Sequence, residues 1–462
     1  MLYDKRKRNL VMMTDTYNLG HQMMKKNTDY ELSHIYNRER DMLLFGFSDN
    51  INYFFKDPIT QDDIDEAKKY CSSIGINMPY KLFERVVDEF KGFPPLSITT
   101  LSEGTWVPKG SPFAQIWNTE EGFGELVTWW ESLLLWGYFI SSCATRSLEI
   151  YKYNQETTPN FYRFHNFGYR SMGQEDRAIQ ASTAWALFNP SSDDFHISRY
   201  IPIRTIPASA HKVVQNWDNE MDCMMHAINT ASSLSTINKS PLSIPIDTFG
   251  SDQFIMTKLI PLARHAESKN VYLVFRPDSG HTLEFARTIL IQCKLNRLDN
   301  VGIIIGDSIN FVTAQLNDMV LRESGIDLHK VVWGIGSKFY EDLNRDYLGW
   351  AMKTAWSNGK PRMKFSDTPV KESIPGRIQV TYCTKEELKI KFDKNPNWDS
   401  TPYGYVSCYF HNKNTLNPTR FIPKLAEIKQ RALKTIPAID KRKLVIEQDI
   451  LDTKEKLRKT YL

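Results

Sequence analysis

The sequence contains few cysteines, and they form no metal-binding or disulfide pattern. The six cysteines among the 462 residues are scattered, with no CxxC pair and no histidine at the spacing of a zinc site. We expect them to be reduced thiols in a cytosol-like compartment. The basic start lacks the long apolar segment and cleavage site of a secretory signal. The longest apolar run, residues 133–140, is too short to cross a bilayer, so a soluble, cytoplasmic protein is expected.

The chain also lacks the common phosphate-binding motifs and a strong net charge. It contains no GxxxxGK(S/T) loop and no GxGxxG that opens a helix after a strand, so phosphate binding would need another device. The formal net charge is only +4. A nucleic-acid-binding surface needs a concentrated basic stripe, and we expect neither nucleic acid nor membrane as a partner. The charge is compatible with small anionic substrates.

What is present is enough apolar material for a large core. Hydrophobic residues make up 41% of the chain, which argues against global disorder. Residues 59–75 and 79–92 have helical spacing and end in glycine, which predicts two helices. Residues 97–119 alternate around turns and predict β-hairpins, and residues 123–153 predict one long apolar helix.

Three aspartates each follow an apolar run at nearly equal intervals. Asp247, Asp278 and Asp307 are 31 and 29 residues apart, and a fourth run ends in the loop around Ser337. About 30 residues is the length of one β-α unit. Because the carboxyl ends of parallel strands converge on one face, this spacing predicts a βα barrel whose acidic mouth handles metal and phosphate.

Further loops carry groups suited to chemistry at that mouth. Residues 275–280, FRPDSG, offer an arginine for an anion, an aspartate for a metal or ribose hydroxyl, and a glycine for close backbone approach. Residues 166–170, NFGYR, place an aromatic ring and a cation after a strand. His211 follows another strand end, where a histidine can act as acid, base or phosphoryl acceptor. Taken singly, each loop also fits a structural turn or cap.

Together and in this order, the motifs resemble the nicotinamide phosphoribosyltransferase family. The matching segments are TDTY with His21, LSEGTWVPKGSPFAQIWNTE, HNFGYR, IPASAH, IDTF, RPDSG, GDSI, NRD and FSDTPVKESIPGR. The resemblance covers almost the whole chain. It implies an irregular type II phosphoribosyltransferase βα barrel with a smaller β-rich α+β domain formed from both chain ends. The expected division is 1–145 and 381–462 for the smaller domain and 146–380 for the barrel.

The resemblance also implies a reaction. The family joins nicotinamide to C1 of 5-phosphoribosyl 1-pyrophosphate, releases pyrophosphate and forms nicotinamide mononucleotide for NAD salvage. Mg²⁺ is required, ATP hydrolysis is coupled through a phosphorylatable histidine, and a homodimer shares its active sites. The physical account agrees, since displacement through an oxocarbenium-like state needs a neutralised pyrophosphate and a held ribose.

Carried onto this chain, the family pattern assigns roles residue by residue. Phe167 and the partner subunit's Tyr17 would cover the two faces of the pyridine ring. Arg170 would bind the carboxamide oxygen, and Asp193, or alternatively Asp194, would accept from the amide nitrogen. The residues implied in catalysis are His211, Asp247, Asp278 and Asp307, of which Asp278 and Asp307 are the expected Mg²⁺ ligands. The other substrate-binding residues implied are Arg38, Arg276, Gly306, Gly336, Ser337, Lys338 and Arg345.

Two departures from the pattern leave alternatives open. The glycine-rich loop that grips the 5′-phosphate in the family is here GIGSK, residues 334–338, and the acidic residue usually before the histidine is Ala210. A side chain at Ser337 could block close backbone approach, or Lys338 could bind an anion. One alternative is therefore a phage-type nicotinamide ADP-ribose transferase that uses ADP-ribose pyrophosphate and makes NAD directly. Another is a non-catalytic sensor of nicotinamide or NAD.

Overall fold

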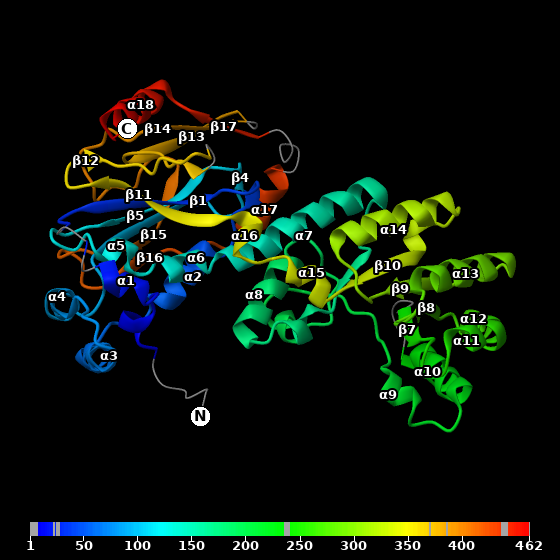
Figure 1. Cartoon of the computed structure of the whole chain (residues 1–462). Helices are drawn as coiled ribbons and strands as arrows, with labels where there is room; N and C mark the ends of the chain where they lie inside the picture. Colours follow the sequence, from blue (N-terminus) through cyan, green and yellow to red (C-terminus); the bar gives the residue numbers. More distant parts are fainter. Residues whose placement is uncertain are drawn as a thin grey trace. The chain divides into compact units, whose positions relative to one another are not determined.

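The computed structural model describes residues 8–21, 24, 28–234, 241–368, 371–384, 387–435 and 442–461. The chain divides into two compact units. The two-ended unit consists of Met1–Thr145 and Asn344–Leu462, and the barrel unit consists of Arg146–Leu343. Figure 1 shows both, with the barrel unit coloured from cyan-green to yellow.

The two-ended unit is organised around a seven-stranded sheet of order β12-β11-β1-β5-β3-β15-β16. All of its strand pairs are antiparallel. The strands are β1 (Glu31–Asn37), β3 (Leu96–Leu101), β5 (Pro112–Asn118), β11 (Trp350–Ser357), β12 (Lys360–Pro361), β15 (Tyr405–Phe410) and β16 (Thr419–Arg420). The central strands β1, β3 and β5 are buried along their whole length, so both faces of the sheet are covered.

Smaller sheets complete this unit. One is two-stranded and consists of β2 (Met42–Leu43) and β4 (Trp106–Val107). The other is three-stranded, in the order β13 (Ile378–Thr384), β14 (Glu387–Phe392) and β17 (Lys443–Ile446). The hairpin predicted over residues 97–119 is confirmed, because β3 pairs antiparallel with β5.

Short helices pack around the sheets of the two-ended unit. They are η1 (Leu10–Met12), α1 (Tyr17–Gly20), α2 (Phe47–Phe54), α3 (Gln61–Ser73), α4 (Tyr80–Phe90), α5 (Leu126–Trp129), α6 (Glu131–Leu135), α16 (Arg345–Leu348), α17 (Leu425–Thr435) and α18 (Gln448–Tyr461). Thr60 and Asp63 form a capping box that starts α3. The two helices predicted over 59–75 and 79–92 are confirmed as α3 and α4.

The single helix predicted over residues 123–153 is wrong. The chain forms α5, α6 and then α7 (Tyr138–Thr157) in its place. The break between α5 and α6 lies at Trp130, whose indole donates to the carbonyl of Leu10 at 2.8 Å, while the indole of Trp129 donates to Val11 at 3.1 Å. These tertiary hydrogen bonds override the helical spacing of the apolar residues.

The barrel unit contains five parallel strands in the order β6-β10-β9-β8-β7. They are β6 (Phe164–Asn166), β7 (Pro241–Pro245), β8 (Tyr272–Arg276), β9 (Val301–Ile305) and β10 (Val331–Ile335). Isolated parallel bridges then join the outer strands: Asn166 to Ser192, Ser191 to Arg204, and Ala208 to Ser243. The segments 190–192 and 204–208 therefore close the ring, and the predicted irregular βα barrel is confirmed.

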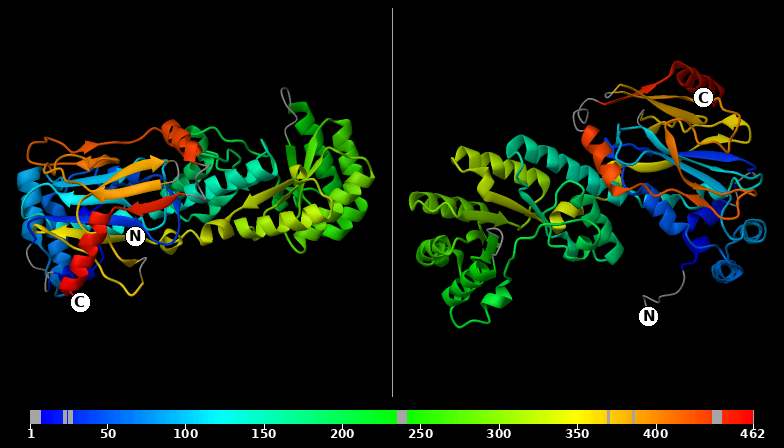
Figure 2. Two further views of the ribbon diagram at one scale, coloured as in Figure 1. Left: turned by 90° about the horizontal axis from the view of Figure 1, so that it is seen from above. Right: turned by 180° about the vertical axis from the view of Figure 1, so that it is seen from behind.

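Helices flank the parallel strands on their outer face (Figure 2). The helices of this unit, besides the end of α7, are η3 (Gly168–Ser171), α8 (Glu175–Ala186), η4 (His196–Arg199), α9 (His211–Val214), α10 (Glu220–Leu234), α11 (Ser251–Thr257), α12 (Leu259–Ser268), α13 (Thr282–Leu295), α14 (Phe311–Glu323), η5 (Leu328–Lys330) and α15 (Ser337–Glu341). None of the helices formed by the described residues combines the length and hydropathy needed to cross a bilayer.

A buried ion pair fixes the strands on one side of the ring. Arg163 and Asp318 are 0% and 1% exposed, and Arg163 Nη1 donates to Asp318 Oδ2 at 2.8 Å. The same carboxylate accepts from the Tyr153 hydroxyl at 2.6 Å and from the Trp333 indole at 3.1 Å. Arg163 Nη2 also donates to Asp318 Oδ1, so four donor groups tie α7, α14, β10 and the segment before β6 together.

The boundary of the barrel unit differs from the sequence prediction. The unit ends at Leu343, whereas the expected boundary was residue 380. The reason is β11, which pairs with β1 in the antiparallel sheet. The two-ended unit is consequently the longer of the two in sequence, although the sequence analysis expected it to be the smaller.

Candidate active site

The carboxyl ends of the parallel strands carry the polar residues that the sequence spacing singled out. Asp247, Asp278, Asp307 and Ser337 each lie two residues beyond the last residue of β7, β8, β9 and β10, respectively. Equivalent positions on neighbouring parallel strands face the same end of a barrel. The structure thus places all four at one mouth.

His211, Asp247 and Asp278 form one cluster at that mouth. His211 Nε2 lies 3.5 Å from Asp278 Oδ2 and 3.8 Å from Asp247 Oδ1. Its Nδ1 is 3.0 Å from the hydroxyl of Thr248. The short helix α9, which begins at His211, sets the imidazole against β7 and β8, so the residue stands against two carboxylates although Ala210 replaces the family's acidic neighbour.

Arg276 lies beside the same cluster. Its Nη2 donates to the carbonyl of Ser209 at 3.0 Å, and its Nε is 3.9 Å from Asp278 Oδ2. That Nε is buried and has no hydrogen-bond partner among the described residues. An arginine held in this way keeps a charged donor available for an anionic ligand.

Asp247 has a similarly incomplete set of partners. Its Oδ2 accepts from Ser279 at 2.5 Å, while its Oδ1 is buried without a hydrogen bond among the described residues. Within those residues, no three His, Cys, Asp or Glu side chains are arranged to hold a metal ion by themselves. Mg²⁺ in nucleotide-processing sites takes one or two carboxylates plus substrate phosphates. The oxygen atoms of Asp247 and Asp278 fit that kind of ligand set.

Asp307 makes no described contact with this cluster. The described hydrogen bond of its carboxylate comes from the neighbouring Ser308, at 3.3 Å, and Ser308 has a φ of 55°. Asp307 therefore lies at the mouth without the histidine and aspartate contacts of Asp247 and Asp278.

Phe167 lies across two glycines at the other side of the mouth. A Cβ atom at Gly334 would stand 2.2 Å from the Phe167 ring, and one at Gly306 would stand 3.5 Å from it. The backbone N–H of Phe167 donates to Ile335 at 2.7 Å. The ring also packs on the apolar barrel interior of Val274, Ile304 and Val332. The backbone hydrogen bond holds Phe167 in place, and the two glycines leave room for its ring.

Asp193 lies near Phe167 and is held in place by two hydrogen bonds. Its Oδ1 lies 2.8 Å from His165 Nε2 and accepts from the Thr205 hydroxyl at 3.0 Å. The His165 ring meets the Phe167 ring edge-on, with centroids 4.8 Å apart. Partial burial alone would raise the pKa of Asp193, but the hydrogen bonds from His165 and Thr205 and the charge of Arg276 hold that pKa below its ordinary value. Asp193 is an anion at neutral pH.

Asp194, the alternative to Asp193, points elsewhere. Its side chain is 2% exposed, and its Oδ1 accepts from the backbone N–H of Ile197 at the start of η4. This residue caps a turn, so the geometry favours Asp193 as the carboxylate of the site.

The loop after Phe167 is tied to the loop after β10. Asn166 Oδ1 accepts from the Gly168 N–H and the Tyr340 hydroxyl, each at 2.8 Å. The hydroxyls of Ser171 and Ser337 are 2.7 Å apart. Arg170, between them, is exposed at the end of η3. Ser337, which stands where the family pattern has a glycine, therefore contacts the loop that follows Phe167.

Lys338 is already paired, whereas Gly336 has open space around it. Lys338 Nζ lies 2.9 Å from Glu341 Oε2, and both side chains are more than half exposed. No atom would lie within 4 Å of a Cβ at Gly336. Neither residue is constrained by packing, so this end of the mouth is less ordered by contacts than the side that holds Phe167.

Tyr17, Arg38 and Arg345 belong to the two-ended unit. Tyr17 is 58% exposed, and its pKa is raised by partial burial and by Glu131 and Asp15 nearby. Arg38 is 8% exposed, and its Nε and Nη2 have no hydrogen-bond partners among the described residues. A buried guanidinium with two unpaired nitrogens is a candidate to bind an anion. In the NRD segment, Arg345 begins α16.

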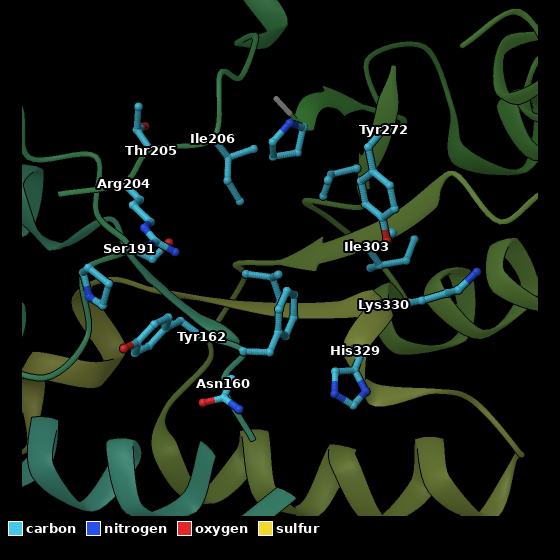
Figure 3. Close-up of a pocket in the computed structure, with 16 residues that line it drawn as sticks. Asn160, Tyr162, Ser191, Arg204, Thr205, Ile206, Tyr272, Ile303, His329 and Lys330 are labelled. Atoms are coloured by element: carbon cyan, nitrogen blue, oxygen red, sulfur yellow. The ribbon is translucent and has the colours of Figure 1, made fainter. Parts of the chain in front are cut away.

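An apolar cavity opens at the opposite end of the barrel (Figure 3). Its volume is about 580 Å³, and it lies where Pro241, Tyr272 and Lys330 mark the amino-terminal ends of the strands. Ser191 and Thr205, the hydroxyl partners of His165 and Asp193, also line it. The charged cluster lies at the carboxyl ends of the strands, whereas the cavity opens at their amino-terminal ends.

Comparisons with known proteins agree with this geometry. Residues 162–388 match the model of the nicotinate phosphoribosyltransferase (NAPRTase) family. The chain is 22% identical over 383 residues to a nicotinamide phosphoribosyltransferase of Xanthomonas campestris, covering 75% of this chain and 80% of that protein. It is 24% identical to one of Mycoplasma pneumoniae, covering 62% and 71%, respectively. The chain is thus similar in sequence to nicotinate and nicotinamide phosphoribosyltransferases, which is consistent with a type II phosphoribosyltransferase family.

Solved structures of phosphoribosyltransferases share the fold. Human nicotinic acid phosphoribosyltransferase superposes with a TM-score of 0.63 at 14% identity, covering 98% of this chain and 99% of that one. The nicotinate-nucleotide pyrophosphorylase of Pyrococcus furiosus gives 0.59 at 16% identity, covering 95% and 98%. The fold class is confirmed, and the relatives and structural neighbours are enzymes, as this chain is expected to be.

The mouth also contains residues that the sequence patterns did not single out. His165 and Thr205 bind Asp193, but each is one polar residue in or beside a short strand and gives no local signal. The FSDTPVKESIPGR motif, residues 365–377, includes residues 369 and 370, which lie outside the described residues.

Proposed function

We propose that this protein joins nicotinamide to C1 of 5-phosphoribosyl 1-pyrophosphate, releases pyrophosphate and forms nicotinamide mononucleotide for NAD salvage. The relatives support phosphoribosyltransferase activity in this pathway. The observation that carries the proposal is that two groups of residues lie at one barrel mouth. The first is the Phe167 ring, called the aromatic shelf below, beside the ionised carboxylate of Asp193. The second is the cluster of His211, Asp247, Asp278 and Arg276.

The aspartate beside the shelf supports an amide substrate. Phe167 offers a flat apolar face for a pyridine ring. Asp193, kept ionised, accepts a hydrogen bond from a carboxamide NH₂ and repels the carboxylate of nicotinate. Arg170, exposed in the next turn, would bind the carboxamide oxygen.

The opposite cluster supports a pyrophosphorylated ribose donor. Arg276 offers a guanidinium donor, and Asp247 and Asp278 offer oxygen atoms for ribose hydroxyls and Mg²⁺. When bound, Mg²⁺ would neutralise the leaving pyrophosphate. The pyridine nitrogen attacks C1 as the C1–O bond to pyrophosphate breaks, so no covalent protein nucleophile is needed. Carboxylates near C1 stabilise the positive charge that develops there.

A donor assay tests the proposal. Purified protein is incubated with nicotinamide, Mg²⁺ and 5-phosphoribosyl 1-pyrophosphate, and the products are separated by chromatography. Nicotinamide mononucleotide and pyrophosphate in equal amounts are expected. The absence of the mononucleotide with this donor would contradict the proposal, and nicotinate in place of nicotinamide is the specificity control.

A second donor is favoured by the loop after β10. Ser337 stands where the family pattern has glycine, and its hydroxyl lies 2.7 Å from the hydroxyl of Ser171. Lys338 adds a cation at the same place. A loop with side chains there suits a donor with a larger 5′ group, such as ADP-ribose pyrophosphate. With that donor the product would be NAD, so the same assay run with each donor distinguishes the two. Nicotinamide binding without turnover of either donor would indicate a sensor.

We also propose that two subunits share each site. Tyr17 and Arg38 would come from the partner subunit, with Tyr17 covering the second face of the pyridine ring, and Arg345 would also meet phosphates. Mixing inactive Tyr17→Ala and Asp278→Asn proteins under subunit exchange is expected to restore activity, because one site of each mixed dimer carries neither change. No recovery in a mixture shown by mass to contain mixed dimers would contradict sharing.

We propose, in addition, that His211 accepts a phosphoryl group from ATP. The imidazole is about one-third exposed and faces Asp247 and Asp278, which would orient it. Incubation with ATP labelled at the γ-phosphate should give an acid-labile phosphoprotein, and His211→Ala should not be labelled. An unlabelled wild-type protein would leave ATP without a role.

A further inference from the structure

The carboxylate beside Phe167 has one saturated oxygen and one free oxygen. Asp193 Oδ1 takes both described hydrogen bonds, from His165 and from Thr205. Its Oδ2 takes none of the hydrogen bonds found among the described residues, and the side chain is 40% exposed. An oxygen that already accepts two donors leaves the other as the better acceptor for a ligand.

The His165 ring is fixed at both nitrogens. Its side chain is 1% exposed, Nε2 faces Asp193, and Nδ1 lies 2.6 Å from the Ser191 hydroxyl. Ser191 can donate to Nδ1, which leaves the proton on Nε2 for Asp193. The serine therefore selects the histidine tautomer that supports the carboxylate.

The location of His165 links this network to the shelf. The residue lies in β6, two positions before Phe167, and β6 pairs with β10 through Gly334 opposite His165. Its ring edge contacts the Phe167 ring. The same side chain therefore sets the distance between the aromatic face and the carboxylate.

We infer that His165 and Thr205 are positioning residues for base selectivity, with Ser191 fixing the tautomer of His165. They hold Asp193 so that Oδ2 meets the NH₂ of a carboxamide above the Phe167 ring, and they disfavour a carboxylic acid in its place. This inference rests on the proposed function, because it names the selectivity device of the proposed nicotinamide site.

The charges around Asp193 predict a pH effect. The ionised or titratable groups that act on it are His165 and Arg276, and Thr205 adds a neutral donor. Without His165 or Thr205, the pKa of Asp193 rises, so protonation begins at a higher pH. The acidic limb of kcat/KM for nicotinamide should therefore move to higher pH in His165→Leu than in the wild type.

The test compares variants by calorimetric binding of nicotinamide and nicotinate and by the split between KM and kcat. His165→Leu removes the donor and is expected to weaken nicotinamide binding about tenfold and to reduce the preference over nicotinate by a similar factor. Thr205→Val is expected to cost about threefold. His165→Gln, whose amide can donate to Asp193, and Thr205→Ser should recover most of the selectivity. Ser147→Ala, which removes a buried hydroxyl bonded to Trp185, is the matched control and should leave selectivity unchanged.

Two results would overturn the inference, and they are distinguishable. If His165→Leu and Thr205→Val lower the melting temperature or kcat but keep the ratio of nicotinamide to nicotinate affinity, these residues are structural and the inference is wrong. If the wild type binds neither base, the proposed function fails first, and the inference fails with it. If the wild type binds nicotinamide without turnover, the affinity ratio still decides.

Discussion

The two sides of the barrel mouth differ in how completely their polar groups are bonded. On the proposed base side, Asp193 is hydrogen-bonded to His165 and Thr205 at 2.8 and 3.0 Å, Asn166 accepts from the Gly168 N–H at 2.8 Å, and Phe167 is packed on glycines. On the proposed donor side, Asp247, His211 and Arg276 each form a hydrogen bond of 2.5–3.0 Å with a neighbouring residue, but the contacts among His211, Asp247 and Asp278 themselves are 3.5–3.8 Å.

This difference indicates which ligand organises which side. On the proposed base side, the side chains are held by their own hydrogen bonds and only Asp193 Oδ2 is left for a ligand, so we infer that this side is preorganised for a small neutral ring. On the donor side, buried Asp247 Oδ1 and Arg276 Nε lack partners among the described residues. Buried polar atoms without partners are costly unless a ligand or ion satisfies them. The donor and its metal would thus complete the second side.

The largest expected effect comes from breaking the donor side. Asp278→Asn removes one negative charge from the cluster, and kcat/KM for the donor should fall about 10²–10³-fold. Steady-state kinetics at varied donor and Mg²⁺ concentrations would measure it. Asp307→Asn is the matched control, because its described contact is with Ser308 alone, and its effect should be smaller. Equal losses in the two variants would show that Asp307 shares the role.

The base side depends on a buried ion pair behind it. Asp318→Asn would leave Arg163 charged and buried without a counter-ion, at a cost of about 3–5 kcal/mol in the free energy of unfolding. Denaturant unfolding measures this loss. Arg287→Ala breaks the exposed pair with Glu284 and should cost at most about 1 kcal/mol. Similar midpoints for the two variants would argue that the Arg163 network is not a support.

Displacing the Phe167 ring would test whether its preorganised position matters for catalytic efficiency. In Gly334→Ala the new Cβ would lie 2.2 Å from the Phe167 ring, so the ring must move. A displacement of this size can reduce kcat/KM by about 10²-fold. Gly336→Ala has open space and serves as control. Kinetics with varied nicotinamide would show the loss in the first variant alone, and an unaffected Gly334→Ala enzyme would mean that the shelf is adaptable.

The smallest effect is expected at the exposed pair after β10. Lys338 already pairs with Glu341 in solvent, so Lys338→Ala should change the donor KM by about threefold or less. The measurement is repeated at two salt concentrations, since any remaining effect should shrink with salt. A loss above tenfold with ADP-ribose pyrophosphate alone would instead identify Lys338 as a ligand of the larger donor.

Local patterns in the sequence were sufficient to place Asp247, Asp278 and Asp307 at the carboxyl ends of parallel strands. The spacing of Asp247, Asp278 and Asp307 reflects one β-α unit each, so the position two residues beyond each strand follows from period and composition. Fold class followed from the same repeat. Which aspartates meet His211 did not follow, because that depends on α9.

The features that the sequence did not reveal depend on distant contacts. The ring closes through single-residue bridges at Ser191, Arg204 and Ala208, in segments without strand periodicity. β11 joins β1 across more than 300 residues of chain, which moved the domain boundary. His165 is a lone polar residue in a three-residue strand, so only its partners reveal a role.

The division of the antiparallel sheet between the two chain ends has a consequence during synthesis. β1, β5 and β3 can pair as soon as residues up to Asn118 have emerged, but β11 and β15, which flank them, are made only after the whole barrel unit. Until then the nascent sheet presents two open edges on the ribosome, and such edges pair readily with other chains. Synthesis of the barrel unit thus delays completion of the sheet. A chaperone or a slow pause in translation would affect how the open edges behave during this delay.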